Sequence, residues 1–315
     1  EALGIFSVKG QVSEVLIKKD GIESTSFTKV TTPRKGILKA FEPQGRVNVR
    51  PPAFVGTDTA AYLGAYFSAG TMWKEIKAAI QQLAPQQYAQ MQQGINSPNA
   101  PLHIERELID TLGDHIFFYV PSEIVSPNPP KKLNILAAVD LKAPPTLEAT
   151  FQKLMMMSGG GQGGLTSVDF MGRTIYQTPA WPLGGGYGAP RPDAPLLQFC
   201  FVIVDNRLII ATSDAMAKRA VRDSKKAQSP LLQEADMRRV LPKMLSRPDI
   251  FFYADPRPIA QWAWQAIEEP AREEGVKLPR YETIKKYLHV AAGTVKWTTD
   301  GTQSKSWIAF PPAQD

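Results

Sequence analysis

The residues that could support catalysis or metal binding are few and scattered along this chain. His103, His115 and His289 are its three histidines, and Cys200 is its one cysteine. None stands in the His-x-x-x-His or Cys-x-x-Cys spacing that is common among zinc ligands. His115 and His289 precede predicted strands in equivalent positions, so they could approach each other across a pseudo-symmetric sheet. We favour the simpler hypothesis of structural or exposed histidines and predict no metal site.

Covalent and acid–base catalysis find equally little support. No Gly-x-Ser-x-Gly segment marks a nucleophile, and Ser158, which precedes a glycine run, has no identifiable base. Glu268, Glu269, Glu273 and Glu274 gather near the end of a predicted helix, where solvated acids are common. Burial would be needed to shift their pKa values, and the sequence gives no sign of it. We therefore favour a non-catalytic protein and keep a hydrolase with an unrecognised site as an alternative.

Two glycine runs, at 159–164 and 184–188, attract attention as nucleotide loops. A phosphate-binding loop needs a lysine after its glycines, and neither run has one. The dinucleotide fingerprint needs a strand before the glycines and a helix after them, whereas a helix is predicted before the first run. We predict mobile loops, which could flank one another as a flap, and no cofactor.

The best surface feature is a basic cluster on a predicted helix. Positions 218, 222 and 225 share one helical face, which could dock an acidic partner, an anionic lipid surface or a polyanion. A solvated helix face is the alternative that we favour. The cluster that defines this predicted anionic-partner surface consists of Lys218, Arg222, Lys225 and Lys226.

Three consecutive methionines end another predicted amphipathic helix, just before the first glycine run. Met155, Met156 and Met157 could line a ligand cleft, because methionine adapts to irregular apolar ligands, although filling the core explains them too. Trp262 and Trp264 stand two positions apart in a further predicted helix, so they cannot both face its core. We expect one of them to be exposed, where it could form part of a contact surface.

Composition excludes several classes of protein. Hydrophobic residues make up 43% of the 315 residues, which argues for a packed core and against disorder. Lys plus Arg number 36 and Asp plus Glu number 30, giving +6, a mildly basic balance that fits weak contact with anionic surfaces. Because no nucleic-acid motif accompanies this charge, specific nucleic-acid binding is not expected.

Targeting signals are equally sparse. No apolar run approaches the roughly 20 residues that a membrane-spanning helix needs. The chain begins at Glu1 without a signal sequence, so we expect it to be part of a longer precursor whose targeting information lies elsewhere.

The elements that must position these residues follow a recurring pattern of buried strand, turn and helix. Asp140 and Asp255 end two of the strands and precede prolines and a helix, so we predict that they cap helices or form turns. The pattern occurs three times, with predicted strands at 62–67, 133–139 and 250–254 and predicted helices at 72–83, 147–154 and 259–267.

The first and third occurrences both predict strand–helix–helix–strand units, and the middle one adds hairpins and helices. Asp20-Gly21, Asp205-Asn206 and Asp300-Gly301 each predict a tight turn between strands. We predict an α+β fold, with mixed β-sheets and helices packed on one face, built from repeated strand–helix(–helix)–strand units. The predicted divisions are an N-terminal β-hairpin and irregular segment at 1–52, a first unit at 53–126, an elaborated middle unit at 127–248 and a third unit with a C-terminal hairpin at 249–315.

Several segments occur in an order that resembles a known family. They are GILKAF at 36–41, the strand and helix that start at 62, LGD at 112–114, LNILAAVD at 133–140 and DNRLIIATS at 205–213. Together, over about 36–260, they resemble a family of large secreted or envelope-associated proteins of planctomycete-type bacteria. The resemblance implies export to the periplasm or cell envelope and a longer precursor. It implies no reaction and supplies no catalytic residues, and the two glycine runs do not match its pattern.

The expected function is thus a non-catalytic interaction or scaffold protein of the envelope, with an unknown protein or envelope partner. The first alternative is a binding protein for an apolar or anionic small ligand held between the α/β units, where pockets are common. The second is the hydrolase. A closed apolar cavity near the three methionines would favour the first alternative, and a buried acid paired with a histidine or serine in a cleft would favour the second.

Overall fold

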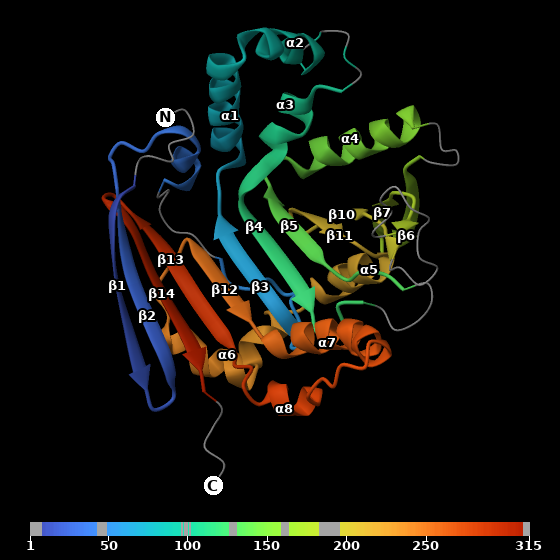
Figure 1. The fold of residues 1–315 in the computed structure, drawn as a ribbon. Coiled ribbons are helices and arrows are strands. Elements are labelled where there is room, and N and C mark those ends of the chain that lie inside the picture. The colour runs from blue at the N-terminus through green and yellow to red at the C-terminus, as the bar shows by residue number, and fades with distance from the viewer. Residues whose placement is uncertain are drawn as a thin grey trace.

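The computed structural model describes residues 8–42, 49–95, 97, 100, 102–125, 131–158, 164–182 and 196–310. One large twisted sheet runs across the molecule, with helices packed around it (Figure 1). Its 12 strands follow the order β1-β2-β14-β13-β12-β3-β4-β5-β11-β10-β7-β6, and neighbouring strands pair antiparallel. A parallel pairing is confined, among the described residues, to one bridge between Lys132 and Leu196. The predicted α+β class is confirmed.

Strands from both ends of the chain form one half of the sheet. They are β1 (Val8–Lys18), β2 (Gly21–Val30), β14 (Gly301–Ala309), β13 (Ala291–Thr298), β12 (Ile250–Ala254) and β3 (Thr59–Tyr66). The other half consists of β4 (Leu112–Pro121), β5 (Leu136–Leu141), β11 (Arg207–Ala211), β10 (Cys200–Val204), β7 (Arg173–Gln177) and β6 (Thr166–Phe170). β8 (Trp181–Pro182) and β9 (Leu196–Leu197) make a separate short ladder.

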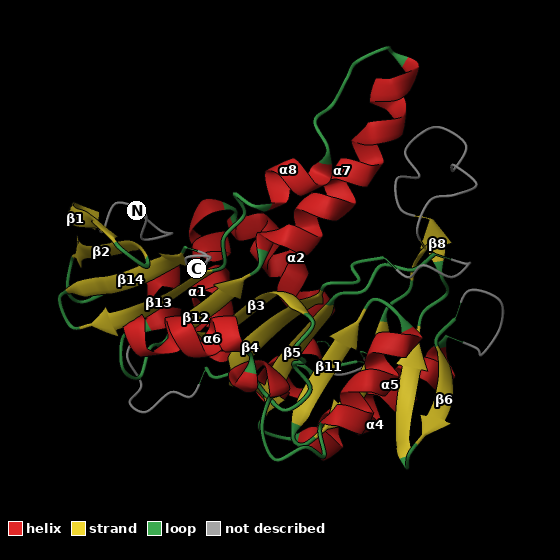
Figure 2. Ribbon diagram, turned by 90° about the horizontal axis from the view of Figure 1, so that it is seen from below, coloured by secondary structure: helices red, strands yellow, loops and turns green. Residues whose placement is uncertain are grey.

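Helices lie on both faces of the sheet, whereas the sequence predicted them on one. Figure 2 shows α7 projecting away on one side and α6 lying against the other. The helices are α1 (Ala69–Leu83), α2 (Pro85–Ile95), α3 (Ile104–Glu107), α4 (Pro144–Met157), α5 (Asp214–Asp223), α6 (Ala235–Val240), α7 (Pro256–Glu273) and α8 (Tyr281–Lys285).

The tight turns form where the sequence predicted them. Asp205 and Asn206 join β10 to β11 with φ values of 49° and 57°. Asp and Asn tolerate this left-handed region better than most residues. Asp20 and Gly21 separate β1 from β2, and Asp300 precedes β14 in the last hairpin. These three predictions are confirmed.

The two aspartates expected to cap helices behave differently. Asp255 is the N-cap of α7 and its carboxylate accepts from the backbone N–H of Arg257 at 3.0 Å, as predicted. The prediction was wrong for Asp140. Ala143 is the N-cap of α4, and the Asp140 carboxylate instead binds His115 and Arg207 on neighbouring strands. Three residues separate Asp140 from the helix, so its side chain stays with the sheet.

The predicted first and third units share an order of elements. β3 is followed by α1, α2, α3 and β4, and β12 by α7, α8 and β13, while β3 and β12 pair side by side. All four predicted divisions contribute strands to the same sheet. Whether the units are true repeats, and where one ends, stay predictions. The glycine runs lie outside the described residues except for Gly164.

One face of the central strands, here called the covered face, holds most of the core. Tyr62, Phe117, Leu136, Ile209 and Phe251 point to it and are 0–3% exposed. The segment around Val49, Phe54 and Val55, together with α5 and α6, packs on these side chains. Burial of this apolar area is the main stabilising contribution to the fold.

Candidate functional site

The opposite face of the central strands, here called the open face, is apolar without interruption. Side chains alternate between faces along a strand, so the strand register defines rows that cross six adjacent strands. The middle row is Gly293, Phe252, Leu63, Phe118, Ala137 and Ile210. The row on one side is Val295, Ile250, Ala65, Ile116, Val139 and Leu208, and the row on the other includes Ala291, Ala254, Ala61 and Val120.

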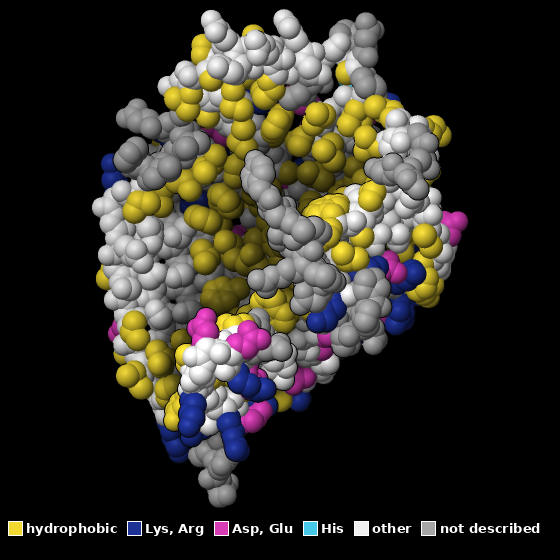
Figure 3. All heavy atoms as spheres, turned by 45° about the vertical axis from the view of Figure 1, so that its right-hand side comes forward, with side chains coloured by type: hydrophobic (Ala, Val, Ile, Leu, Met, Phe, Trp, Pro, Cys, Tyr) yellow, Lys and Arg dark blue, Asp and Glu magenta, His cyan; other side chains and the backbone are white. Residues whose placement is uncertain are grey.

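Within the described residues, no helix covers the middle of the open face. Phe118, at the centre of the middle row, is 43% exposed, whereas Phe117, its neighbour on the covered face, is 2% exposed. Leu63 and Phe252 beside it are half-buried. Figure 3 shows a hollow on this side of the molecule, and the described atoms that line it are largely hydrophobic. A continuous concave apolar surface of this kind is typical of a binding site.

The hollow is limited by a change of residue type on one side and by α4 on the other. Beyond β13, two of the rows continue into serines: Ser306 pairs with Ser24, and the hydroxyls of Ser26 and Ser304 are 2.7 Å apart. The row of Ala291 continues into Ile308 and Ile22. In the other direction, Leu147 and Phe151 of α4 pack on the open-face side chains of β5, β11 and β7. The exposed apolar floor is therefore widest on the central strands, and one of its rows extends to Ile308, which is 40% exposed.

α7 adds exposed apolar side chains beside the lower ends of β3 and β4 (Figure 1). It contacts β3, yet Ile259, Trp262 and Ile267 are 39%, 46% and 49% exposed. Trp264 is half-buried. The prediction that one of the two tryptophans is exposed is confirmed, and Trp262 is that residue.

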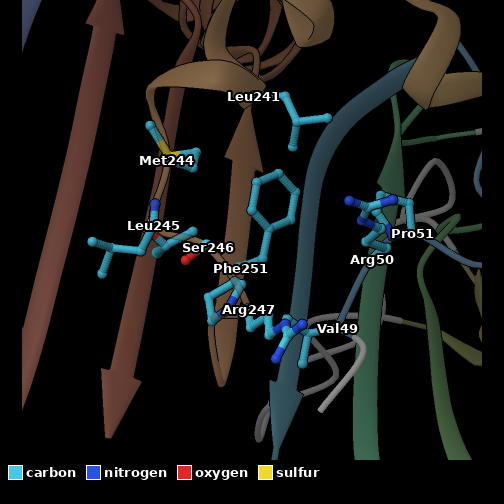
Figure 4. A pocket seen from close by; sticks show the side chains of 11 residues that line it. Val49, Arg50, Pro51, Leu241, Met244, Leu245, Ser246, Arg247 and Phe251 are labelled. Atoms are coloured by element: carbon cyan, nitrogen blue, oxygen red, sulfur yellow. Dashed lines mark hydrogen bonds between the residues drawn. The ribbon is translucent and has the colours of Figure 1, made fainter. Parts of the chain in front are cut away.

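A second concave site, a cavity of about 480 Å³, lies on the covered face behind β12. Figure 4 shows Met244 and Leu245 on one side of it, Arg50 on the other and Phe251 between them, with Leu241 above Phe251. Its remaining lining is Val49, Pro51, Ser246, Arg247, Pro248 and Thr294. Its described lining includes two arginines and no acidic residue, and the cavity is here called the arginine cavity. Its lining residues come from three of the four predicted divisions, 1–52, 127–248 and 249–315.

An acid–histidine pair lies elsewhere on the covered face. Nδ1 of His115 is 2.7 Å from the Asp140 carboxylate, which also accepts from Nε of Arg207 at 2.8 Å. Burial alone would raise the pKa of Asp140, but its hydrogen bond with His115 and the charge of Arg207 outweigh burial and lower it. Nε2 of His115 is buried without a partner among the described residues. The rings of Tyr66 and Phe117 pack beside His115. Among the described residues no serine, threonine or cysteine side chain is hydrogen-bonded to it, so the pair gives a hydrolase little support.

The same register separates His115 from His289. His115 lies opposite Tyr66 at the end of β3, whereas His289 precedes Ala291, which is level with Ala61 near the start of β3. The two histidines therefore lie at opposite ends of the central strands, so the approach that we considered as an alternative does not occur. His289 instead packs its ring against Phe310.

A half-buried ion pair holds α5 to the strands. Arg219 donates two hydrogen bonds to the Asp58 carboxylate, which also accepts from the Tyr119 hydroxyl at 2.9 Å. Burial would raise the pKa of Asp58, but Arg219 outweighs it and lowers the pKa. The Asp58 carboxylate already accepts hydrogen bonds from Arg219 and Tyr119, so it helps to hold the covered face together and has few free acceptor positions for a ligand.

The predicted basic surface lies on α5 and just after it. Lys218 is 3.5 Å from Asp214, and Lys226 is 3.1 Å from Asp223. Arg222 and Lys225 are exposed. Acids on the same helix thus offset part of the positive charge, and binding of an anionic partner here stays a prediction.

The three methionines separate at the end of α4. Met155 packs against the core, while Met156 and Met157 are 77% and 51% exposed. They do not line the arginine cavity, and their role in a cleft stays a prediction. Cys200 is buried, and burial raises the pKa of its thiol to about 12, which keeps it protonated and unreactive.

Sequence reasoning missed the residues of both concave sites. The run at 116–120 is apolar at every position, which in an antiparallel sheet indicates that both faces are apolar. That signal was available for Phe118, although it does not say which face a helix covers. Arg50 and Arg247 stand in proline-rich loops with no motif to distinguish them.

Within the described part of the chain, no group of three or more His, Cys, Asp or Glu side chains could hold a metal ion. No helix in it has the length and apolarity needed to cross a membrane.

Comparison with known proteins identifies no family. No family model and no curated protein matches this chain. The structure of the Treponema protein TP0453 in its crystal form III is similar to 85% of this chain over 82% of its own length, with 10% sequence identity and a TM-score of 0.38. A likeness this distant supports no conclusion about site or function.

Proposed function

We propose that this chain binds an apolar, chain-like ligand, such as a lipid acyl chain, in the hollow of the open face. The observation that carries the proposal is the 43% exposure of Phe118 at the centre of uninterrupted apolar rows. Removing such surface from water is favourable by roughly 25 cal/mol per Å². A ligand that covers Phe118, Leu63 and Phe252 would therefore gain affinity from contact area alone.

The shape and composition of the hollow favour a chain over a polar ligand. Its three rows hold no hydrogen-bonding side chain, so a sugar or nucleotide would lose its bonds with water without replacement. Because the surface is concave in Figure 3, a flat protein partner would leave gaps. A protein partner with a protruding apolar helix could still fill it, which keeps the scaffold hypothesis as an outcome to be tested.

A neutral apolar fluorophore, N-phenyl-1-naphthylamine, tests the proposal, because it cannot use the arginine cavity through charge. We expect its fluorescence to rise on binding and a long-chain alcohol to displace it. Phe118→Asp should weaken binding by about tenfold or more, because a charge in an apolar site opposes desolvation.

Phe27→Asp is the matched control, since Phe27 is 36% exposed but lies on β2 and faces the other side. Equal loss in both variants would show that the dye binds nonspecifically. An unaffected Phe118→Asp protein would remove the open face as the site.

Export to the periplasm or envelope is part of this proposal and rests on the family resemblance described above. A binder of acyl chains would have its ligand source in the adjacent membranes. Fractionation of the native cells, with the chain detected by antibody, tests this location. Recovery with the cytoplasmic fraction would contradict it.

A further inference from the structure

The arginine cavity and the open hollow lie back to back on β12. Phe251 lines the cavity and Phe252 belongs to the middle row of the open face. Adjacent residues of a strand point to opposite faces, so the two sites share a wall but no lining residue. Any ligand of the cavity is therefore separate from the ligand proposed for the hollow.

The cavity combines an apolar interior with positive charge. Leu241, Met244 and Phe251 supply an apolar wall and floor, and Arg50 and Arg247, both exposed, lie at its edge. Asp249, the acidic residue nearest in sequence, is buried and uses its carboxylate to accept from the backbone N–H of Trp297 at 2.6 Å. None of the described residues that line the cavity is an acid that could neutralise Arg247.

Arg247 occupies a backbone conformation that favours glycine. Its φ is 52°, in the left-handed region, which costs an ordinary residue about 1–2 kcal/mol. Within the described part of the chain its guanidinium has no hydrogen-bond or ion-pair partner. Strained residues persist where the surroundings fix them and are common at binding sites. A long cation at this position is explained by a ligand better than by the fold.

We infer that the arginine cavity binds a small anionic amphiphile, a carboxylate or phosphate monoester with a short alkyl chain. The head group would pair with Arg247, assisted by Arg50, because guanidinium matches the geometry of both anions. The alkyl chain would pack on Met244, Leu241 and Phe251. A volume of about 480 Å³ is within the range of small-molecule sites.

Calorimetric titration with octanoate and octyl phosphate tests the inference, and octanamide serves as the neutral probe of the same shape. We expect both anions to bind at neutral pH and octanamide to bind at least about tenfold more weakly, since a charged hydrogen bond is lost. Arg247→Gln should reduce octanoate affinity by about tenfold and leave octanamide unchanged. Equal affinity for octanoate and octanamide, or an unaffected Arg247→Gln variant, would overturn the inference.

Two further variants separate this site from the fold and from the hollow. Arg247→Gly removes the charge while relieving the backbone, so it should lose octanoate binding without losing stability. Phe118→Asp should leave octanoate binding intact, because Phe118 lies on the other face. If Phe118→Asp abolishes octanoate binding, the anion occupies the hollow and the arginine cavity is not its site.

Discussion

Phe117 and Phe118 are the same residue type on one strand, and the structure uses them in opposite ways. Phe117 points to the covered face and is 2% exposed, while Phe118 points to the open face and is 43% exposed. The first contributes its burial to folding. The second keeps its apolar area in contact with water, so that area remains available to a ligand. The proposed binding function rests on this apolar surface, which folding does not bury.

The two faces also treat polar groups differently. The covered face includes Asp58, Asp140 and Thr294, each hydrogen-bonded to a neighbouring element. The rows of the open face contain no such group. Buried polar groups must be paired, and the loops and helices on the covered face supply the partners. A face that is to receive an apolar ligand needs no partners.

Truncating both phenylalanines tests whether the two faces differ in how much they stabilise the fold. We expect Phe117→Ala to lower the free energy of unfolding by about 3–5 kcal/mol, as for other buried aromatic side chains. Phe118→Ala should lower it by about 1 kcal/mol or less, because much of the side chain is exposed already. Urea denaturation measures both, and similar losses would show that the open face is packed in solution.

A second prediction concerns the ion pair between Arg219 and Asp58, which holds α5 on the covered face. Arg219→Met should lower the free energy of unfolding by about 2 kcal/mol, because Asp58 would keep its charge with one partner fewer. Lys218→Met, the neighbouring position on α5, should change it by less than about 0.5 kcal/mol, since Lys218 makes only a partly exposed pair with Asp214. A large effect of Lys218→Met on stability would point to a structural role for the predicted basic surface.

Acid should weaken the covered face through Asp140. Its pKa is lowered in the folded protein by His115 and Arg207 despite burial. The ionised carboxylate therefore stabilises the fold above the unfolded-state pKa of about 3.9, and this contribution is lost as pH falls through the lower folded-state pKa. Asp140→Asn should remove this part of the acid sensitivity. Parallel unfolding curves for wild type and variant between neutral and acidic pH would contradict it.

The smallest expected effect is a gain. Arg247→Gly should raise the free energy of unfolding by about 0.5 kcal/mol, because glycine adopts the left-handed region freely but gains flexibility in the unfolded chain. Thermal unfolding measures the shift. Arg247→Ala is the control, since it removes the same side chain and keeps the strain. A gain with alanine as large as with glycine would place the effect in the charge and not in the backbone.

Local signals explain which parts of the fold could be predicted. The turn at Asp205-Asn206 and the cap at Asp255 follow from side chains that act within a few residues. The pairing of β3 with β12 joins Tyr62 to Tyr253, across most of the chain, and nothing local encodes it. Asp140 was misassigned for this reason, because its partners His115 and Arg207 lie on strands that are adjacent only in space.

The candidate sites were less predictable than the fold. An apolar run indicates that Phe118 lies in a strand, but its exposure depends on where α4 and α7 come to rest. Arg247 is a candidate only because of its backbone conformation and because Phe251 of β12 forms part of the cavity beside it. Neither feature can be predicted from the local sequence. Met156 and the basic residues on and just after α5 drew attention in the sequence, and they lie on exposed surface. For the basic residues, a solvated helix face was the favoured alternative.

Photo-cross-linking with a long-chain alcohol that carries a diazirine in its chain tests the central claim most directly. After irradiation and digestion, the account predicts labelled residues on the open face of β3, β4 and β12, around Leu63, Phe118 and Phe252. Excess unlabelled alcohol should suppress the labelling. Labels confined to α5, to the edge strands β1 and β2 or to the arginine cavity would contradict the account.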